Sequence, residues 1–278
     1  MNLLQIFILA IVQGAAELLP VSSSAHVIVA EKLMGLDPTA PAMTMLLVML
    51  HTGTMFAVIV YFWSAWRQSY FSSATRFKMN AVWIIVATAA TAVVGLALMQ
   101  VIKIVVGRGA PGFEIEHLFG NSKLMATALA AAGVLIIVSS RMRGGDAPLT
   151  IRRAAWIGAV QGLCLPFRGF SRSGATISTG MALGIARRRA EEFSFALAVV
   201  ITPAVIVREG WRLYKAEAAA GDVGNLAQLM GPSLAGMVFS FLAGLLALRW
   251  LSSWLEQGRW HLFGAYCLVA AAFVAWLG

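Results

Sequence analysis

The chain has 278 residues, of which 60% are hydrophobic and only 12% are charged, and its formal net charge is +9. Soluble globular domains carry about 25% charged residues, so this composition excludes a soluble enzyme and predicts an all-α polytopic membrane protein. The Lys and Arg residues lie in short loops between apolar runs, which membrane topology explains without a nucleic-acid partner. The cysteines, Cys164 and Cys267, have no disulfide or metal-ligand spacing.

Apolar runs of two lengths alternate along the chain in a repeated order. The predicted segments are a short pair at 2–14 and 25–35, spans at 43–65, 79–103 and 122–140, a second short pair at 152–165 and 174–186, and spans at 190–207, 232–250 and 260–277. The long runs have roughly 18–25 residues and can cross a bilayer, whereas the short runs of ~11–14 residues cannot cross alone. We therefore interpret each short pair as a re-entrant helical hairpin that is buried within the protein.

The order of one hairpin and three spans occurs twice, and an odd number of crossings per half turns the second half upside down. This predicts an inverted-topology repeat with six transmembrane helices in a single integral membrane domain, residues 1–278. Repeat one covers about 1–140 with its hairpin at 2–35, and repeat two covers about 150–278 with its hairpin at 152–186. In such repeats the ligand site lies near the membrane midplane, where the hairpin tips meet.

Loop charges predict the orientation of the chain. More Lys and Arg residues fall around 66–78, 141–153, 187–189 and 249–259 than in the loops on the opposite side. The positive-inside rule places these four regions in the cytoplasm and both termini outside it. Residues 1–12 lack a basic n-region, so we interpret them as mature protein rather than a signal peptide.

Two serine-rich turns hold most of the polar residues that the hairpins contain. The first string, QGAAELLPVSSSAH, begins at Gln13, and the second, QGLCLPFRGFSRSGAT, begins at Gln161. Each string starts with Gln-Gly, passes a proline and reaches Ser-x-Ser before a new apolar helix. The ionisable residues within the two strings are Glu17, His26, Arg168 and Arg172. Ionisable residues in an apolar chain are expensive to bury, and they indicate a functional site by default.

The serines of both turns precede predicted helices. The pairs are Ser23 and Ser24 before a helix expected from Ala25, and Ser171 and Ser173 before a helix expected from Gly174. Serine is a good N-cap, and a helix N-terminus presents free N–H groups and partial positive charge. Two such ends that face each other would form an anion site, and phosphate suits it. Simple capping is the commoner role of such serines, but a buried arginine beside them favours a bound anion.

Basic and small residues of the second turn fit the same site. Arg172 can bind phosphate oxygens bidentately, and Gly169 and Gly174 allow close approach of the backbone. In the first turn, Glu17 and His26 can reach one cavity from the two arms of the hairpin. A carboxylate and an imidazole beside phosphate suggest acid/base catalysis or a divalent cation with oxygen ligands.

Glu17 and His51 each have an alternative role. A structural buried ion pair of Glu17 with Arg172 or Arg168 is the alternative for the carboxylate, and it is compatible with catalysis. His51 is a lone histidine on an apolar helix, and such a residue is more often structural. We therefore expect His51 to support the site rather than to act in it.

These strings resemble a known family, the undecaprenyl-diphosphate phosphatases, also called bacitracin-resistance proteins. The segment from Glu17 to His26, ELLPVSSSAH, resembles the first motif of the family, and the segment from Gly169 to Ser178, GFSRSGATIS, resembles the second. The strings HTGT at His51 and EFSF at Glu192 also fit. The resemblance covers essentially the whole chain, and the family fold has the same hairpins, spans and inverted repeat.

The resemblance implies a hydrolase of the bacterial inner membrane that removes the terminal phosphate of undecaprenyl diphosphate. This reaction recycles the lipid carrier of peptidoglycan synthesis, supports cell shape and gives resistance to bacitracin. The expected partners are the polyprenyl diphosphate and membrane lipid, with a homodimer as a further option and a divalent cation, Mg²⁺ or Ca²⁺, as cofactor. With both termini outside the cytoplasm, they would lie in the periplasm. The alternative function is a transporter or flippase of a phosphorylated polyprenyl lipid, because inverted repeats with broken helices are common in transporters.

The resemblance also assigns roles to individual residues. The catalytic residues would be Glu17, His26, Ser23 and Arg172. The substrate-binding residues would be Ser22, Ser24, Arg168, Gly169, Ser171, Ser173, Gly174, Thr176 and Gln13. The cation would be held by Glu17 and Gln13. Ser23, His26 and water all stay open as the nucleophile.

Two departures from the family pattern affect the site. The family has an acidic pair four residues apart in its first motif, and Gln13 replaces the first member of that pair here. An amide oxygen can still bind a cation, but the site has one negative charge fewer. The second turn is one residue longer than usual, and Arg168 stands directly before Gly169. This extra cation could contact phosphate or pair with Glu17.

Overall fold

The computed structural model describes residues 2–17, 19–108, 113, 115–142, 145–220, 226–256 and 259–277. Its elements are α1 (Leu3–Glu17), α2 (Ser23–Leu33), α3 (Pro41–Ser69), α4 (Ala74–Val105), the short 3₁₀-helix η1 (Ile115–Gly120), α5 (Ser122–Ser140), α6 (Ile151–Cys164), α7 (Arg172–Ala182), α8 (Arg187–Ala220), α9 (Leu226–Glu256) and α10 (Trp260–Leu277). The part of the chain that the structure describes contains no strand. The predicted all-α class is confirmed.

Six of these helices are long and apolar enough to cross a membrane. They include residues Pro41–Ser69, Ala74–Val105, Ser122–Ser140, Arg187–Ala219, Met230–Arg249 and Trp260–Leu277. Each predicted span falls within one of them or overlaps it closely, so the prediction of a multi-pass membrane protein is confirmed. The remaining α-helices α1, α2, α6 and α7 have 11 to 15 residues, and they correspond to the predicted short segments.

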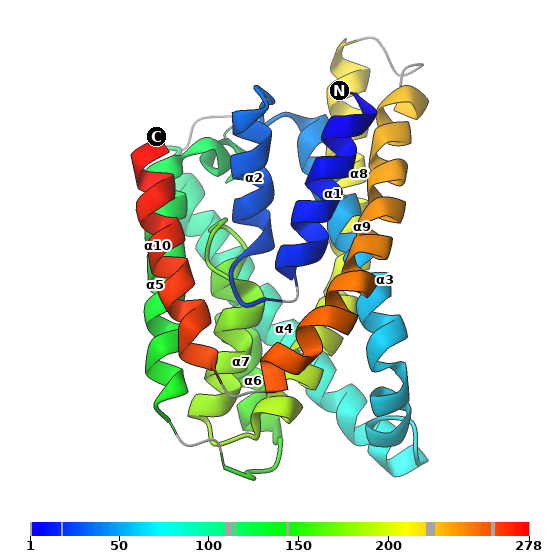
Figure 1. Cartoon of the computed structure of the whole chain (residues 1–278), viewed down its shortest axis with the longest axis vertical. Coiled ribbons are helices and arrows are strands. Elements are labelled where there is room, and N and C mark those ends of the chain that lie inside the picture. Colours follow the sequence, from blue (N-terminus) through cyan, green and yellow to red (C-terminus); the bar gives the residue numbers. More distant parts are fainter. Residues whose placement is uncertain are drawn as a thin grey trace.

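The short helices pack as two pairs at opposite ends of the bundle. In Figure 1, α1 and α2 occupy the upper half, α6 and α7 occupy the lower half, and their connecting turns lie between them. The first helix of each pair packs on a long helix of the other half, α1 on α9 and α6 on α4. Both chain termini lie at the upper end (Figure 1). Two further features remain predictions. One is that the hairpins are buried at membrane depth, and the other is that the two halves form an inverted repeat.

Each of the repeated Gln-Gly strings lies where a short helix crosses a long one closely. A Cβ atom on Gly14 would lie within 3 Å of the Ala243 and Gly244 backbone of α9. A Cβ atom on Gly162 would meet the Thr91 and Gly95 backbone of α4 equally closely. Because backbone cannot move aside as a flexible side chain can, glycine is required at both crossings.

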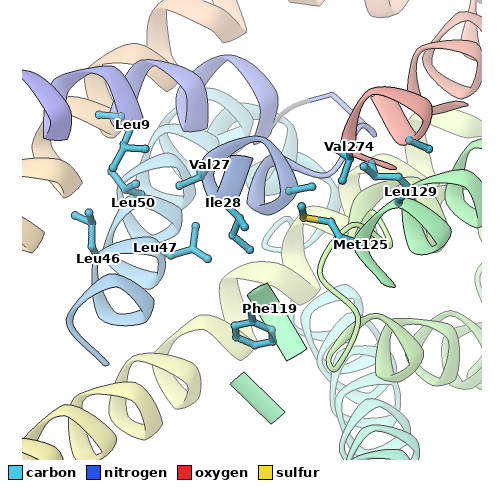
Figure 2. Close-up of a cluster of buried hydrophobic side chains, with 14 of the residues drawn as sticks. Leu9, Val27, Ile28, Leu46, Leu47, Leu50, Phe119, Met125, Leu129 and Val274 are labelled. Carbon is cyan, nitrogen blue, oxygen red and sulfur yellow. The ribbon is translucent and has the colours of Figure 1, made fainter. Parts of the chain in front are cut away.

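The first hairpin rests on a core that links both ends of the chain. Figure 2 shows Leu9 of α1 and Val27 and Ile28 of α2 beside leucines of α3. Met125 of α5 and Val274 of α10 complete the same cluster (Figure 2). Since these side chains are buried, the turn between α1 and α2 is held by apolar packing on three sides. This packing fixes where the polar residues of that turn can point.

We expect Gly14→Val to destabilise the protein by about 1–3 kcal/mol, because the added methyl groups must displace the α9 backbone. The matched control is Gly210→Val, since a Cβ atom at Gly210 meets no atom within 4 Å. The measurement is the melting temperature of each purified variant in detergent. Equal melting temperatures for the two variants would contradict the close crossing.

Candidate active site

The two serine-rich turns end in helix N-termini that point at one cavity. In the second turn Ser171 is the N-cap of α7, and its Oγ accepts a hydrogen bond from the Gly174 N–H at 3.1 Å. The prediction that Ser173 also precedes the helix is wrong, because α7 begins at Arg172. In the first turn the prediction that Ser23 and Ser24 precede the helix is wrong as well, because α2 begins at Ser23. Ser22 is the N-cap there, with a left-handed φ of 64°, and its hydroxyl caps no helix N–H. The hydroxyl of Ser23 is therefore not used for capping.

The Glu17 carboxylate is the centre of the site. Its Oε1 accepts a hydrogen bond at 2.9 Å from Nη2 of Arg172, which belongs to the other half of the chain. Its Oε2 accepts hydrogen bonds from Ser23 Oγ at 2.5 Å and from Gln13 Nε2 at 2.7 Å. Glu17 is only 9% exposed, so these partners replace water around a buried charge. Of the two pairings considered for Glu17, the structure contains the one with Arg172.

His51 completes this cluster. Its Nε2 lies 3.4 Å from Glu17 Oε2 and 3.3 Å from Ser23 Oγ. Its Nδ1 lies 2.8 Å from the carbonyl oxygen of Leu47, so Nδ1 carries a proton and donates it. In the neutral ring the Nε2 lone pair then faces Ser23. His51 is thus a direct neighbour of Glu17 and Ser23, and in the sequence the HTGT string that fits the family marks its position.

His26 lies outside the cluster around Glu17. Among the described residues it does not line the cavity, and its ring nitrogens bond instead to the Ser22 carbonyl oxygen and the Tyr266 hydroxyl. The structure thus gives the imidazole position beside Ser23 to His51. A catalytic role for His26 stays a prediction that this geometry does not favour.

The cavity has a volume of about 300 Å³ and extends from Glu17 to Arg208 and Glu209 in the C-terminal half of α8. Its polar wall is formed by Glu17, Ser22, Ser23, Ser24, His51, Gln161, Arg168, Ser171, Arg172, Ser173, Thr202, Arg208 and Glu209. Its apolar wall includes Leu96, Met99, Ile115, Phe119, Leu165, Phe167 and Phe170. A cavity lined by both polar and apolar side chains suits an amphipathic ligand.

Four residues predicted to bind substrate have other contacts in the structure. Thr176 is fully buried and donates to the Arg172 carbonyl oxygen at 2.8 Å, which steadies the first turn of α7. Gly169 has a φ of 107°, a conformation that favours glycine, and it lets the second turn reverse. A Cβ atom on Gly174 would lie 3.1 Å from the Pro20 carbonyl oxygen, so this glycine lets the two turns touch. Gln13 contacts Glu17 rather than the cavity.

Arg168, the residue that lengthens the second turn, lines the cavity. Its guanidinium carbon lies 4.3 Å from the centre of the Phe119 ring in η1, a cation–π contact. This contact places a second positive charge on the cavity wall in addition to Arg172. The longer turn therefore adds a cation to the cavity lining.

The oxygen atoms beside Glu17 were tested for their fit to a divalent cation. Among the described residues no three His, Cys, Asp or Glu side chains gather into a metal-binding group. The Gln13 Oε1 atom, however, is buried without a hydrogen-bond partner next to the Glu17 carboxylate. Mg²⁺ commonly takes only one or two protein oxygens and fills its shell with water and substrate phosphates. Glu17, which lines the cavity, can share such a cation with a phosphate ligand, and the buried Gln13 amide oxygen is the other protein oxygen that could bind it.

Known proteins match this chain along nearly its full length. The family model described as "Bacitracin resistance protein BacA" matches residues 6–273. "Undecaprenyl-diphosphatase 2" of Acinetobacter baylyi is 65% identical over 277 residues, which cover 99% of this chain and 97% of the relative. "Undecaprenyl-diphosphatase" of Korarchaeum cryptofilum is 31% identical and covers 97% of both chains. "Undecaprenyl-diphosphatase 2" of Burkholderia lata is 33% identical over 98% of this chain and 96% of the relative.

We expect Glu17 and Arg172 to be energetically coupled, because removal of either residue leaves the other as an uncompensated buried charge. A double-mutant cycle with Glu17→Gln, Arg172→Gln and both together should give a coupling of about 1–3 kcal/mol. The measurement is the thermal stability of each variant in detergent. Single effects that simply add in the double variant would contradict this prediction.

Proposed function

The chain belongs to the bacitracin resistance protein family, and from this premise we propose that it hydrolyses undecaprenyl diphosphate to undecaprenyl phosphate and inorganic phosphate in the cavity around Glu17. The observation that carries the location is that two helix N-termini, Arg172 and the Ser23–Glu17 pair meet in one cavity. The names of the relatives favour this hydrolysis over transport of a phosphorylated lipid.

The diphosphate would lie between the first turns of α2 and α7. Free N–H groups and the partial positive charge of both helix ends favour an anion there. Glu17 and the Ser194 carbonyl oxygen engage two of the five N–H donors of Arg172, so others are available for phosphate oxygens. Arg172 would thus bind phosphate and neutralise Glu17 at the same time, which stabilises charge on the transferring group.

Ser23 would be the nucleophile, because its Oγ is the hydroxyl in contact with both the carboxylate and the imidazole. Its proton would pass to Glu17 Oε2 at 2.5 Å, or to His51 Nε2 at 3.3 Å. The Ser23 Oγ–P bond forms while the bond from the terminal phosphorus to the bridging oxygen breaks, and undecaprenyl phosphate leaves. The base would pass the Ser23 proton to the leaving phosphate and then accept a proton from water, which attacks the phosphoserine phosphorus. As the Oγ–P bond breaks, the base would return that proton to Ser23 Oγ and inorganic phosphate would leave.

The apolar wall of the cavity would receive the start of the isoprenoid tail. A volume of about 300 Å³ holds a diphosphate and little more, so the rest of the tail must lie outside in the lipid. Leu96 and Met99 of α4, together with Leu165 beyond α6, provide the apolar surface next to the phosphate-binding turns. The tail would therefore leave the cavity along α4.

The membrane of action would be the bacterial inner membrane, with the cavity open to the periplasm. Loop charges place both termini outside the cytoplasm. The cavity reaches Arg208 and Glu209 in the outer part of α8, which lies at the same end of the bundle as the termini (Figure 1). Phosphate released on that side would leave without crossing the membrane.

A divalent cation would be held by Glu17 together with Gln13 Oε1. When bound, it would supply positive charge to the substrate phosphates. The side chains of the protein alone account for substrate orientation and for the proton transfer from Ser23.

We expect Ser23→Ala to lower phosphate release by about 10³-fold or more, since it removes the nucleophile. His51→Ala should lower it by about 100-fold through loss of a proton acceptor, and Arg172→Ala by about 100- to 1,000-fold. The measurement is phosphate release from a C15 or C55 diphosphate by purified protein, with an acid-quenched phosphoenzyme sought in wild type and in Ser23→Ala.

Ser69→Ala, which changes a serine at the end of α3 outside the cavity, is the control. Full activity in both His51→Ala and Arg172→Ala would rule out this site, and wild-type protein without phosphate release would rule out the function.

If the cation is required, a chelator should abolish phosphate release.

The variant Gln13→Glu restores the second carboxylate of the family pattern. We expect this variant to need roughly tenfold less Mg²⁺ for half-maximal activity, since ligand charge tunes the affinity of such sites over decades. The second readout is the Mg²⁺-dependent rise in melting temperature, which measures binding without catalysis. Gln68→Glu, the same change at an exposed position near the end of α3 and outside the cavity, is the matched control. Equal shifts in both variants would argue against a cation at Gln13 and Glu17.

A further inference from the structure

A histidine outside the cavity, His26, is tied to the turn that presents Ser23. Its Nδ1 lies 2.8 Å from the carbonyl oxygen of Ser22, and its Nε2 lies 2.7 Å from the hydroxyl oxygen of Tyr266 on α10. The imidazole and phenol rings stack with centroids 5.6 Å apart and an interplanar angle of 11°. The ring is therefore fixed from two sides, by its own helix and by α10.

The partners of the His26 ring decide where its protons lie. A carbonyl oxygen only accepts, so Nδ1 carries a proton and donates it to Ser22. In the neutral ring Nε2 then accepts a hydrogen bond from the Tyr266 hydroxyl. Both ring nitrogens are engaged, and neither faces Ser23, whereas Nε2 of His51 does. The bond to Ser22 persists when Nε2 gains a proton, because Nδ1–H is present in both forms of the ring.

Ser22 is the backbone position that needs such support. Its φ of 64° and ψ of 80° lie in the left-handed region, which residues other than glycine rarely adopt. Conformations of this kind persist only where the surrounding structure holds them. The peptide that joins Ser22 to Ser23 sets the direction of the Ser23 side chain towards Glu17. The Ser22 carbonyl oxygen accepts hydrogen bonds from the Ala25 and His26 backbone N–H groups at 3.1 and 3.4 Å, and the shorter bond from His26 Nδ1 at 2.8 Å adds a side-chain restraint to that peptide.

Tyr266 connects this turn to a membrane-spanning helix. The residue is 48% exposed on α10, on the outer surface of the bundle. In the apolar part of a bilayer its hydroxyl finds no water, so an unmade hydrogen bond there is costly and the bond to His26 is correspondingly strong. Because of this bond, the position of α10 determines where the His26 ring lies.

We infer that His26 is a positioning residue, which with Tyr266 holds the left-handed Ser22 turn so that Ser23 points at Glu17 and His51. The inference rests on the proposed function, because it takes Ser23 as the attacking group. It assigns His26 a hydrogen-bond donor role and no proton transfer to or from the substrate. It also adds Tyr266, a residue of the last helix, to the set that controls the reaction.

The decisive experiment compares three substitutions of His26 in the full-length protein. The side-chain amide of Asn can place an N–H near the position of Nδ1, whereas Gln places its amide farther out and Ala has no donor. We expect His26→Asn to retain activity within about threefold of wild type, and His26→Gln and His26→Ala to lose about 10- to 100-fold in kcat through misplacement of Ser23. KM should change by less than about twofold, since the phosphate ligands stay in place. The pH profile of His26→Asn should match that of wild type.

A second pair of variants tests the link to α10. Tyr266→Phe removes the hydroxyl and keeps the ring, and we expect a smaller loss in kcat of about threefold to tenfold. Tyr61→Phe makes the same change at another tyrosine on a spanning helix, 40% exposed, and should leave kcat unchanged. Melting temperatures of all variants show whether each is folded.

The outcomes separate this inference from the proposed function. A wild-type protein that releases no phosphate overturns the function itself. If wild type is active and His26→Asn is as inactive as His26→Ala while folded, His26 acts in proton transfer and the inference is wrong. Full activity in folded His26→Ala, or equal effects of Tyr266→Phe and Tyr61→Phe, overturns it as well.

Discussion

The ion pair between Glu17 and Arg172 is the interaction on which the site depends. Each residue comes from a different half of the chain, and each would be expensive to bury alone in an apolar bundle. Their contact satisfies both charges and brings the first turns of α2 and α7 to one place. It also leaves Ser23 and His51 around the second carboxylate oxygen, so the same contact that compensates burial assembles the reactive groups.

Close helix crossings make this pair geometrically available. Gly14 lets α1 lie against α9, and Gly162 lets α6 lie against α4. The glutamine before each glycine donates to a threonine of a long helix, Gln13 to Thr54 at 3.4 Å and Gln161 to Thr91 at 3.1 Å. These bonds engage the amide nitrogens of the two glutamines, whereas both amide oxygens are buried without a hydrogen-bond partner. The two Gln-Gly strings are thus packing elements that set the depth of the turns.

The two histidines near the site show how partners decide the role of the same side chain. Both donate from Nδ1 to a carbonyl oxygen four residues earlier in their helix. The Nε2 of His51 is left facing a carboxylate and a hydroxyl, whereas the Nε2 of His26 faces a tyrosine on the outer surface. Only the first arrangement can accept a proton from Ser23. The polar groups of the cavity therefore form one cluster, with a supporting contact behind the first turn.

The sequence by itself determined the six spans, the two pairs of short helices and the two turns that carry Glu17 and Arg172. Length and hydropathy fix these features, because a bilayer requires about 20 apolar residues for a helical span and penalises buried charge. Only the tertiary structure decided which residues touch across those turns. His51 lies far along the chain from Ser23 and on an apolar helix, so no local pattern places it beside Glu17, and the ring of His26 turns away because Tyr266 is near. Spacing along a chain gives the face of a helix on which a side chain lies, whereas its partners depend on how distant helices pack.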